Sequence, residues 1–264
     1  MVWRLSELRR RIFSRERKND NFAILFLKMA LILNIETATE VCSVALADEK
    51  GLIDYRENTE GKSHAALLTT FVEALLQHNN ILPNQLDAVA VSSGPGSYTG
   101  LRIGVSATKG ICYGVNKPLL SLSTLQCMAH GFIKQLSVEQ TIAYENAWFC
   151  PMIDARRLEV YTAFFDIRGN SQTEISAEII DETSFIQVLD QRKIIFFGNG
   201  SDKCKDILLH SNAFFYPGFL TSAKDMIELS QKEYLKKNFM DVAYFEPYYL
   251  KDFVATIPKN KVLK

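Results

Sequence analysis

Apolar and polar positions alternate regularly along the first quarter of the chain. Short apolar runs at 31–35, 41–47 and 51–56 are separated by polar turns, which predicts three strands. Strands joined by such short connections form an antiparallel meander. From 67 to 76 the apolar residues take helical spacing, and Ser63 is a suitable N-cap for this helix. Three strands followed by a helix are therefore predicted.

The chain is organised around residues 89–114, which read VAVSSGPGSYTGLRIGVSATKGICYG. The apolar residues at 88–91 predict a buried strand. The turn 94–97 follows it, because proline presets one backbone angle and glycine accepts positive φ. A helical period begins at Thr99 or Gly100. Small residues share one face of this helix, at Gly100, Gly104, Ala107 and Gly110.

This stripe of small residues has two interpretations. Glycine inside a helix costs roughly 1 kcal/mol relative to alanine, so something must approach closely in compensation. One interpretation places the free N–H groups of the helix start against a phosphate. The other is tight packing without a ligand. The stretch is not a standard phosphate loop, because Gly100 is followed by Leu101 and Arg102 rather than by Lys and Ser or Thr.

The remainder of the chain alternates predicted strands with predicted helices. A strand at 118–122 is followed by a helix that begins at Ser123 or Thr124 and reaches about Phe132. Alternation of this kind predicts a mixed sheet with helices on its faces. Further strands are predicted at 148–154, 160–167, 193–197 and 213–216, and further helices at 181–189 and 221–237.

Composition narrows the class of protein. The chain has 264 residues, of which 47% are hydrophobic and 23% charged, with a formal net charge of zero. This length allows one large domain or two modest ones. A neutral balance argues against a dedicated nucleic-acid binder, but not against a component of an RNA-modifying complex. The five cysteines form no C-x-x-C pair, which indicates reduced, buried thiols in a cytosolic protein.

Residues 1–28 differ in character from the rest of the chain. Basic residues crowd their first part, ahead of a short apolar run at 22–27. A signal peptide is not indicated, because Lys28 interrupts the run and no small-residue cleavage site comes after it. A membrane helix would need about 20 apolar residues. We interpret residues 1–28 as a disordered or helical extension, with Met29 as the natural start.

No catalytic motif stands out from spacing alone. The nucleophile elbow G-x-S-x-G is absent. A charged cluster at 154–159 is either a solvated turn with weak surface ion pairs or a docking edge. No metal site is predicted, because neither H-x-x-x-H nor H-E-x-x-H is formed by His64, His78, His130 and His210.

Five segments together carry a specific signal. They read ILNIETATEVCSVAL, KSHAALLTTFVEALL, AVSSGPGSYTGLRIGVSATKGICYG, IDARRLEVYTAFF and EPYYLKDF, and they span nearly all of 30–253. In these segments the chain resembles the TsaB family, also called YeaZ, of the tRNA threonylcarbamoyladenosine pathway. The resemblance implies an actin-like (ASKHA, ribonuclease H-like) α/β fold, with mixed sheets flanked by helices. The implied lobes are 29–131 and 132–264, with the last helix at 221–237 packing back on the first lobe.

The resemblance extends to the catalytic paralogue TsaD, whose two metal-binding histidines would fall at Thr124 and Met128. A hydroxyl and a thioether cannot replace imidazoles at such a site. The resemblance therefore implies a partner subunit without catalytic activity of its own, which binds and activates TsaD together with the ATPase TsaE. The complex modifies the adenosine beside the anticodon in tRNAs that read codons starting with A. Two alternatives are a metal-dependent, glycoprotease-like peptidase and an ASKHA kinase.

Site residues are also implied by the resemblance. Nucleotide phosphates are expected to face Glu36, Thr37, Gly94, Gly96 and Ser97. The broad apolar stripe of the first helix is compatible both with a core and with a partner helix. An interface with TsaD or with a second copy is expected at His64, Leu67, Leu68, Phe71, Leu75, Gly100, Gly104 and Ala107.

Cofactors and partners are expected on the same grounds. No cofactor is expected beyond weak adenine nucleotide binding at the subunit boundary. Nucleotide hydrolysis is not favoured, because Glu36 is one methylene longer than the Asp common in the superfamily. A homodimer of the chain is a further expectation. Transfer RNA is expected to bind only through the complex, in the cytoplasm and without a membrane.

Overall fold

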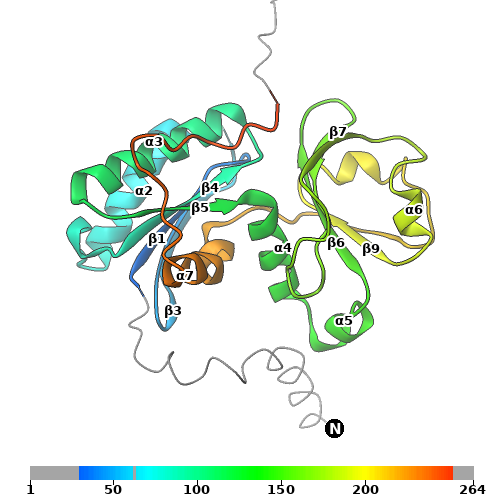
Figure 1. Ribbon diagram of the computed structural model, residues 1–264, viewed down its shortest axis with the longest axis horizontal. Coiled ribbons are helices and arrows are strands. Elements are labelled where there is room, and N and C mark those ends of the chain that lie inside the picture. Colours follow the sequence, from blue (N-terminus) through cyan, green and yellow to red (C-terminus); the bar gives the residue numbers. More distant parts are fainter. Residues whose placement is uncertain (1–29, 62–63, 252–264) are drawn as a thin grey trace, which may run out of the picture.

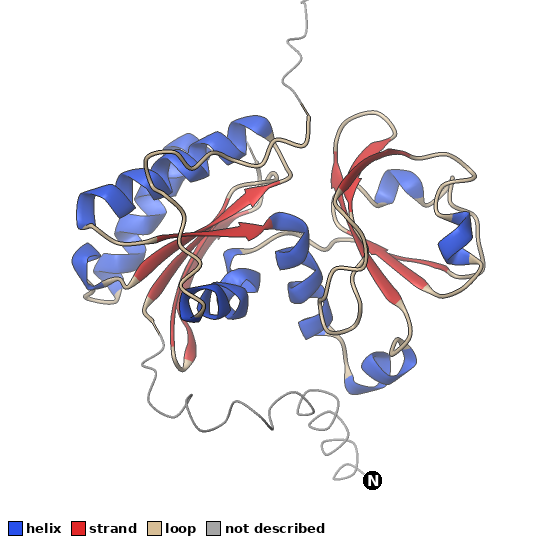
Figure 2. Cartoon of the chain, viewed as in Figure 1, coloured by secondary structure: helices blue, strands red, loops and turns tan. Residues whose placement is uncertain are grey.

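Two five-stranded sheets form the framework of the computed structural model, which describes residues 30–61 and 64–251 (Figures 1 and 2). The first sheet has the order β3-β2-β1-β4-β5. The predicted antiparallel meander is confirmed, and β4 and β5 add to it in parallel. The strands are β1 (Ile32–Glu36), β2 (Cys42–Asp48), β3 (Gly51–Asn58), β4 (Ala88–Gly94) and β5 (Leu119–Ser123).

The second sheet repeats the topology of the first. Its order is β10-β9-β6-β7-β8, and again an antiparallel meander is extended by two parallel strands. Read from its own first strand, each sheet has the order 3-2-1-4-5, which confirms two related ribonuclease H-like lobes. The strands are β6 (Trp148–Asp154), β7 (Glu159–Thr162), β8 (Ser176–Ile179), β9 (Ile194–Phe197) and β10 (Ala213–Tyr216).

Helices cover both faces of the first sheet (Figure 1). Alternate residues of β1 point to opposite faces, so Leu33 and Ile35 pack towards α2 and α3, while Ile32 packs towards α7. One face carries α2 (His64–His78) and α3 (Tyr98–Val115), with the short 3-10 helix η2 (Pro83–Gln85) beside them. The other face carries α4 (Thr124–Gln135), η4 (Ala223–Met226) and α7 (Ile227–Leu235).

The chain returns to the first lobe near its end. The α7 helix packs against β1 and β5. Gln231 of this helix exchanges two hydrogen bonds with the backbone of Ala30, of 3.2 and 2.7 Å. These contacts join the start of the described chain to α7 on one face of the first sheet.

Aromatic packing fills the core of the second lobe. The rings of Phe132 and Phe197 stack with their centroids 4.1 Å apart, and Phe132 also meets Phe219 edge to face. Phe132 belongs to α4, so this helix serves the cores of both lobes. The remaining helices of the lobe are α5 (Val138–Ala143), α6 (Ile186–Leu189) and η3 (Asp202–Cys204).

Two predicted elements of the second lobe are wrong in length. The strand expected at 160–167 ends at Thr162, because the next residue faces Pro151, which has no N–H to donate to the ladder. The pairing resumes only as an isolated bridge between Phe149 and Phe165. The helix expected at 181–189 is reduced to α6, because Phe185 takes a left-handed φ of 62°.

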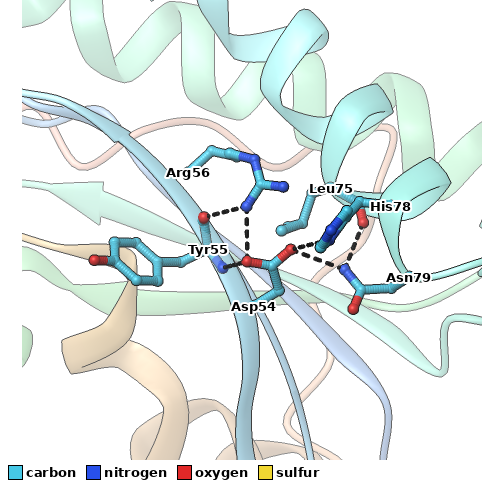
Figure 3. A network of polar contacts seen from close by, with 6 residues as sticks. All are labelled: Asp54, Tyr55, Arg56, Leu75, His78 and Asn79. Atoms are coloured by element: carbon cyan, nitrogen blue, oxygen red, sulfur yellow. Dashed lines mark hydrogen bonds and ion pairs between the residues drawn. The ribbon is translucent and has the colours of Figure 1, made fainter.

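The edge strand β3 is fastened to the end of α2 by a polar network (Figure 3). The carboxylate of Asp54 accepts hydrogen bonds from Arg56 (2.7 Å), His78 (3.0 Å), Asn79 (3.0 Å) and the Tyr55 N–H (2.8 Å). Partial burial alone would raise the pKa of Asp54, but these donors outweigh it and lower the pKa to about 2. Asp54 therefore stays ionised across the physiological pH range.

Three expectations fall on residues that the structure does not describe. The extension at 1–28, the start at Met29 and the N-cap at Ser63 lie outside the described residues. Of the helices in the described part, none combines the length and the apolar character that crossing a membrane requires.

Candidate functional site

A cleft between the two lobes lies beside the glycine turn. A cavity of about 500 Å³ lies there, walled by the β1–β2 turn, the starts of α2 and α3, and the second lobe. Its polar lining comes from Thr39, Glu40, His64, Ser97, Thr99, Asp154 and Asn199.

A side-chain amide bridges the lobes at the floor of this cleft. Asn199 of the second lobe donates to the carboxylate of Glu40 in the first lobe, at 2.5 Å. Its carbonyl oxygen accepts the Asp154 N–H at 3.0 Å. The bridge holds the β1–β2 turn against the end of β6.

The start of α3 closes directly onto the β1–β2 turn. The Thr37 hydroxyl donates to the Gly100 carbonyl at 2.9 Å, and the Ser97 N–H donates to the Ala38 carbonyl at 2.7 Å. A Cβ on Gly100 would collide with the Thr37 carbonyl oxygen, and one on Gly104 with the Thr37 hydroxyl. Gly100 and Gly104 therefore serve packing within the lobe, the second of the two interpretations that spacing left open.

This closure corrects the prediction for the nucleotide-facing residues. Glu36 and Thr37 have no exposed surface, because α3 and the turn cover them. Gly94 is also buried, since the backbone of Tyr248 occupies the space beside it. Gly96 is half-buried against Ala38, and only Ser97 is exposed.

Two carboxyl groups lie in or near the sealed interior. The Glu36 Oε1 accepts the Ala38 N–H at 2.6 Å, while Oε2 has no partner among the described residues. Burial raises the pKa of Glu36 to about 7, against the hydrogen bond from Ala38, which lowers it. Burial likewise raises the pKa of Asp225 to about 7. The interior thus favours protonated carboxyl groups near neutral pH.

The positions that the resemblance assigns to metal-binding histidines in TsaD lie in the same interior. Thr124 is fully buried, and its hydroxyl lies 2.7 Å from that of Ser92. Met128 is almost fully buried, and its terminal methyl fills the space beside Gly198. In the part of the chain that the structure describes, no three His, Cys, Asp or Glu side chains are arranged to hold a metal ion.

The charged turn between β6 and β7 is exposed to solvent and has a defined backbone structure. Asp154 accepts the Arg156 N–H at 2.9 Å and forms an ion pair with Lys203. Arg156 and Arg157 both adopt left-handed backbone angles, with φ of 73° and 51°. The Arg156 side chain is thereby presented at the mouth of the cleft.

The segment that ends the described chain also belongs to the cleft. The Tyr248 N–H donates to the Ser93 carbonyl at 2.8 Å, and the Tyr249 ring lies against that of Tyr98. Lys251 then forms an ion pair with Glu159 of the second lobe. Sequence reasoning missed this role, although the EPYYLKDF segment was one of the five that carried the resemblance.

Comparisons with known proteins decide the family. The profile described as "TsaD: tRNA N6-adenosine threonylcarbamoyltransferase" matches residues 58–259. The Escherichia coli (strain K12) "tRNA threonylcarbamoyladenosine biosynthesis protein TsaB" is 30% identical over 233 residues, which cover 85% of this chain and 96% of that protein. The chain belongs to the TsaB family. The TsaB protein of Haemophilus influenzae is 28% identical over 234 residues, covering 85% and 94%.

A solved structure shares the fold. The structure "YeaZ from Pseudomonas aeruginosa" superposes with a TM-score of 0.72 at 23% identity, covering 84% of this chain and 100% of that chain. The fold and the family that the five segments indicated are thus confirmed.

Within this TsaB-family chain, the predicted interface residues divide into two groups. Leu68 and Leu75 are fully buried core residues, and Gly100 and Gly104 pack on the β1–β2 turn, so none of the four can contact a partner directly. That part of the prediction is wrong. The inner half of the α2 stripe packs against the first sheet, and the two glycines pack against the turn. The remaining members are half-buried at the surface: His64, Leu67, Phe71 and Ala107.

Further surface residues of α3 were missed. Ile103 and Ile111 are half-buried apolar residues beside Ala107, and Gly110 is an exposed glycine with nothing near its missing Cβ. Positions 103, 107, 110 and 111 follow one another at intervals of four, three and one residues, which places them on one side of the helix. This spacing could have revealed the stripe. Leu67, Phe71, Ile103, Ala107, Gly110 and Ile111 are called the α2–α3 seam below.

The role of Gly100 predicts a stability difference between two glycines of one helix. Gly100→Ala should lower the free energy of unfolding by roughly 1–3 kcal/mol, because its methyl group would strike the Thr37 backbone. In the matched variant Gly110→Ala the free energy of unfolding should instead rise by about 0.5–1 kcal/mol. The new methyl group enters open space, and alanine is a better helix former than glycine. Urea unfolding of both variants measures the difference, and equal effects would refute the packing role.

The raised pKa of Glu36 predicts a pH-dependent stability. Its ionisation opposes folding, so the penalty is absent below the ordinary pKa of 4.5 and grows until pH about 7. Glu36→Gln should therefore gain stability relative to the wild type as the pH rises through this window, by on the order of a few kcal/mol. Thermal unfolding across the window measures this, with exposed Glu49→Gln as the control. A pH-independent difference for Glu36→Gln would contradict the assignment.

Proposed function

We propose that this chain is the partner subunit, without catalytic activity of its own, of the machinery that makes threonylcarbamoyladenosine in tRNA. In this role it binds and activates the paralogue TsaD, together with the ATPase TsaE. The observation that carries the proposal is the buried interior at Thr124 and Met128, where a hydroxyl and a thioether stand at the positions that the resemblance assigns to the metal-binding histidines of TsaD. Membership of the TsaB family supports the same pathway.

The α2–α3 seam is the proposed contact surface for TsaD. It combines half-buried apolar side chains on α2, such as Phe71, with small residues on α3, such as Ala107 and Gly110. Small residues let a partner helix approach closely, while the apolar groups gain about 25 cal/mol for each Å² they bury. The same surface would serve a homodimer when TsaD is absent, so the two assemblies would compete.

Nucleotide and tRNA have secondary places in the proposal. Adenine nucleotide would bind weakly at the boundary between subunits, because Glu36 and Thr37 are sealed within this chain. Transfer RNA would be engaged as part of the complex, in the cytoplasm where tRNA is modified. A peptidase or kinase activity of the chain finds no support in any cluster of described side chains.

Reconstitution tests the proposal. Purified TsaD and TsaE should form modified tRNA only when this chain is added. Gly110→Arg should abolish this activation and co-elution with TsaD, because the new side chain projects from the seam into open space. Ala143→Arg, at an exposed helical position of the second lobe, is the control and should leave both unchanged.

Two outcomes would overturn the proposal. Modified tRNA made equally well without this chain would remove the activating role. Full activity and normal co-elution of Gly110→Arg would remove the seam as the contact surface.

A further inference from the structure

A slot rich in tyrosine lies beside the cleft, where the end of the described chain crosses from the first lobe to the second. Its volume is about 460 Å³. Four of the chain's ten tyrosines line it, which is a strong concentration of aromatic surface. They are Tyr98, Tyr161, Tyr248 and Tyr249.

The tyrosine rings are held in place by contacts with one another and with residues outside the slot. The rings of Tyr98 and Tyr249 lie 4.9 Å apart and are tilted by 34°. Arg102 donates to the Tyr98 hydroxyl at 3.3 Å, and the backbone of Tyr248 is anchored to Ser93. Tyr248 and Tyr249 nonetheless keep 47% and 37% of their surface exposed. Rings that are fixed but accessible suit the stacking of a planar ligand.

Positive charge accompanies the rings. Asp154 and Lys251 also line the slot, but each is neutralised in an ion pair with Lys203 and Glu159 respectively. Arg156 forms no ion pair with any described residue, and the left-handed turn presents it to the slot. The slot therefore offers aromatic faces and one uncompensated guanidinium group.

These features fit a planar ring that carries a single negative charge, which is the chemistry of one nucleotide unit in an RNA strand. A nucleoside polyphosphate fits less well, because Glu40 and Asp154 line the adjoining cavity and no described cluster of side chains suits a metal ion that would screen its charge. Unpaired bases are also the part of RNA that proteins stack on aromatic side chains.

We propose that this slot binds one unpaired nucleotide of RNA, with the base stacked against Tyr249 and the phosphate facing Arg156. The inference rests on the proposed function, because that function supplies a structured RNA as substrate. It goes further by giving this chain its own contact with the RNA. The neutral net charge of the whole chain does not oppose it, since the contact needs only this local surface.

Equilibrium binding of a fluorescein-labelled RNA hairpin with an unpaired loop to the full chain tests the inference. Tyr249→Ala should weaken hairpin binding about tenfold, because one stacking platform is lost. Arg156→Asn should reduce the slope of log affinity against log salt by about 0.7, the value for one phosphate of a single strand. Asparagine tolerates the left-handed backbone at this position, so the turn should keep its structure.

Matched controls stand outside the slot. Tyr244→Ala removes a tyrosine that is 85% exposed, and Arg157→Asn removes the neighbouring arginine, which has a similar backbone. Both should bind the hairpin as the wild type does. Competition with free AMP distinguishes a nucleotide within an RNA strand from a free nucleotide. AMP should displace the hairpin only at far higher concentration.

Three results would overturn the inference: no hairpin binding by the wild type, equal binding of a fully paired duplex, or equal loss in variants and controls. Displacement of the hairpin by AMP at equal concentration would identify a free-nucleotide site instead and would also overturn it. Failure of the proposed function is distinguishable, because it is read from modified tRNA in the reconstituted complex and not from hairpin binding.

Discussion

The contact between the start of α3 and the β1–β2 turn determines the character of this molecule. Two glycines bring the helix backbone onto Thr37, and the Thr37 hydroxyl and the Ser97 N–H bond across the contact. No residue with a Cβ fits at Gly100 without moving the turn. Glycine has a weaker helix propensity than alanine, but the close contact that it allows covers Glu36 completely. Spacing alone left open either a phosphate-facing helix start or tight packing, and in the folded chain this contact is packed.

Sealing this joint determines the environment of the side chains beneath it. Glu36 is removed from water, so its pKa rises and the group favours its neutral form. Thr124 and Met128 fill the neighbouring space with a hydroxyl and a methyl group. The surfaces that we propose for recognition lie on the outside of the fold: the α2–α3 seam and the tyrosine slot. A TsaB-family chain built in this way suits a partner subunit.

The sequence predicted most of the first lobe because its elements are strongly periodic and its turns are short. The strands at 148–154 and 213–216 were also predicted with their observed bounds. The repeated 3-2-1-4-5 order was invisible in the residues themselves, since topology can be duplicated without a sequence repeat, and it entered only through the resemblance. The strand break opposite Pro151 and the left-handed Phe185 were missed, because each depends on a neighbour in space or on a rare backbone angle. For the same reason, periodicity could not separate the buried Leu68 from the accessible Phe71, or foresee that Tyr248 would cover Gly94.

The central claim is that the β1–β2 turn is closed against the start of α3 in the chain by itself. Hydrogen exchange at the amides of Ser97 and Ala38 tests it directly, because the Ser97 N–H donates across the joint to the Ala38 carbonyl, and the Ala38 N–H donates to Glu36 within the turn that the joint covers. The account predicts that both amides exchange slowly, at rates close to those of the core strands, and that magnesium with ADP leaves those rates unchanged. Fast exchange at these amides, or protection that appears only when the nucleotide is added, would contradict it.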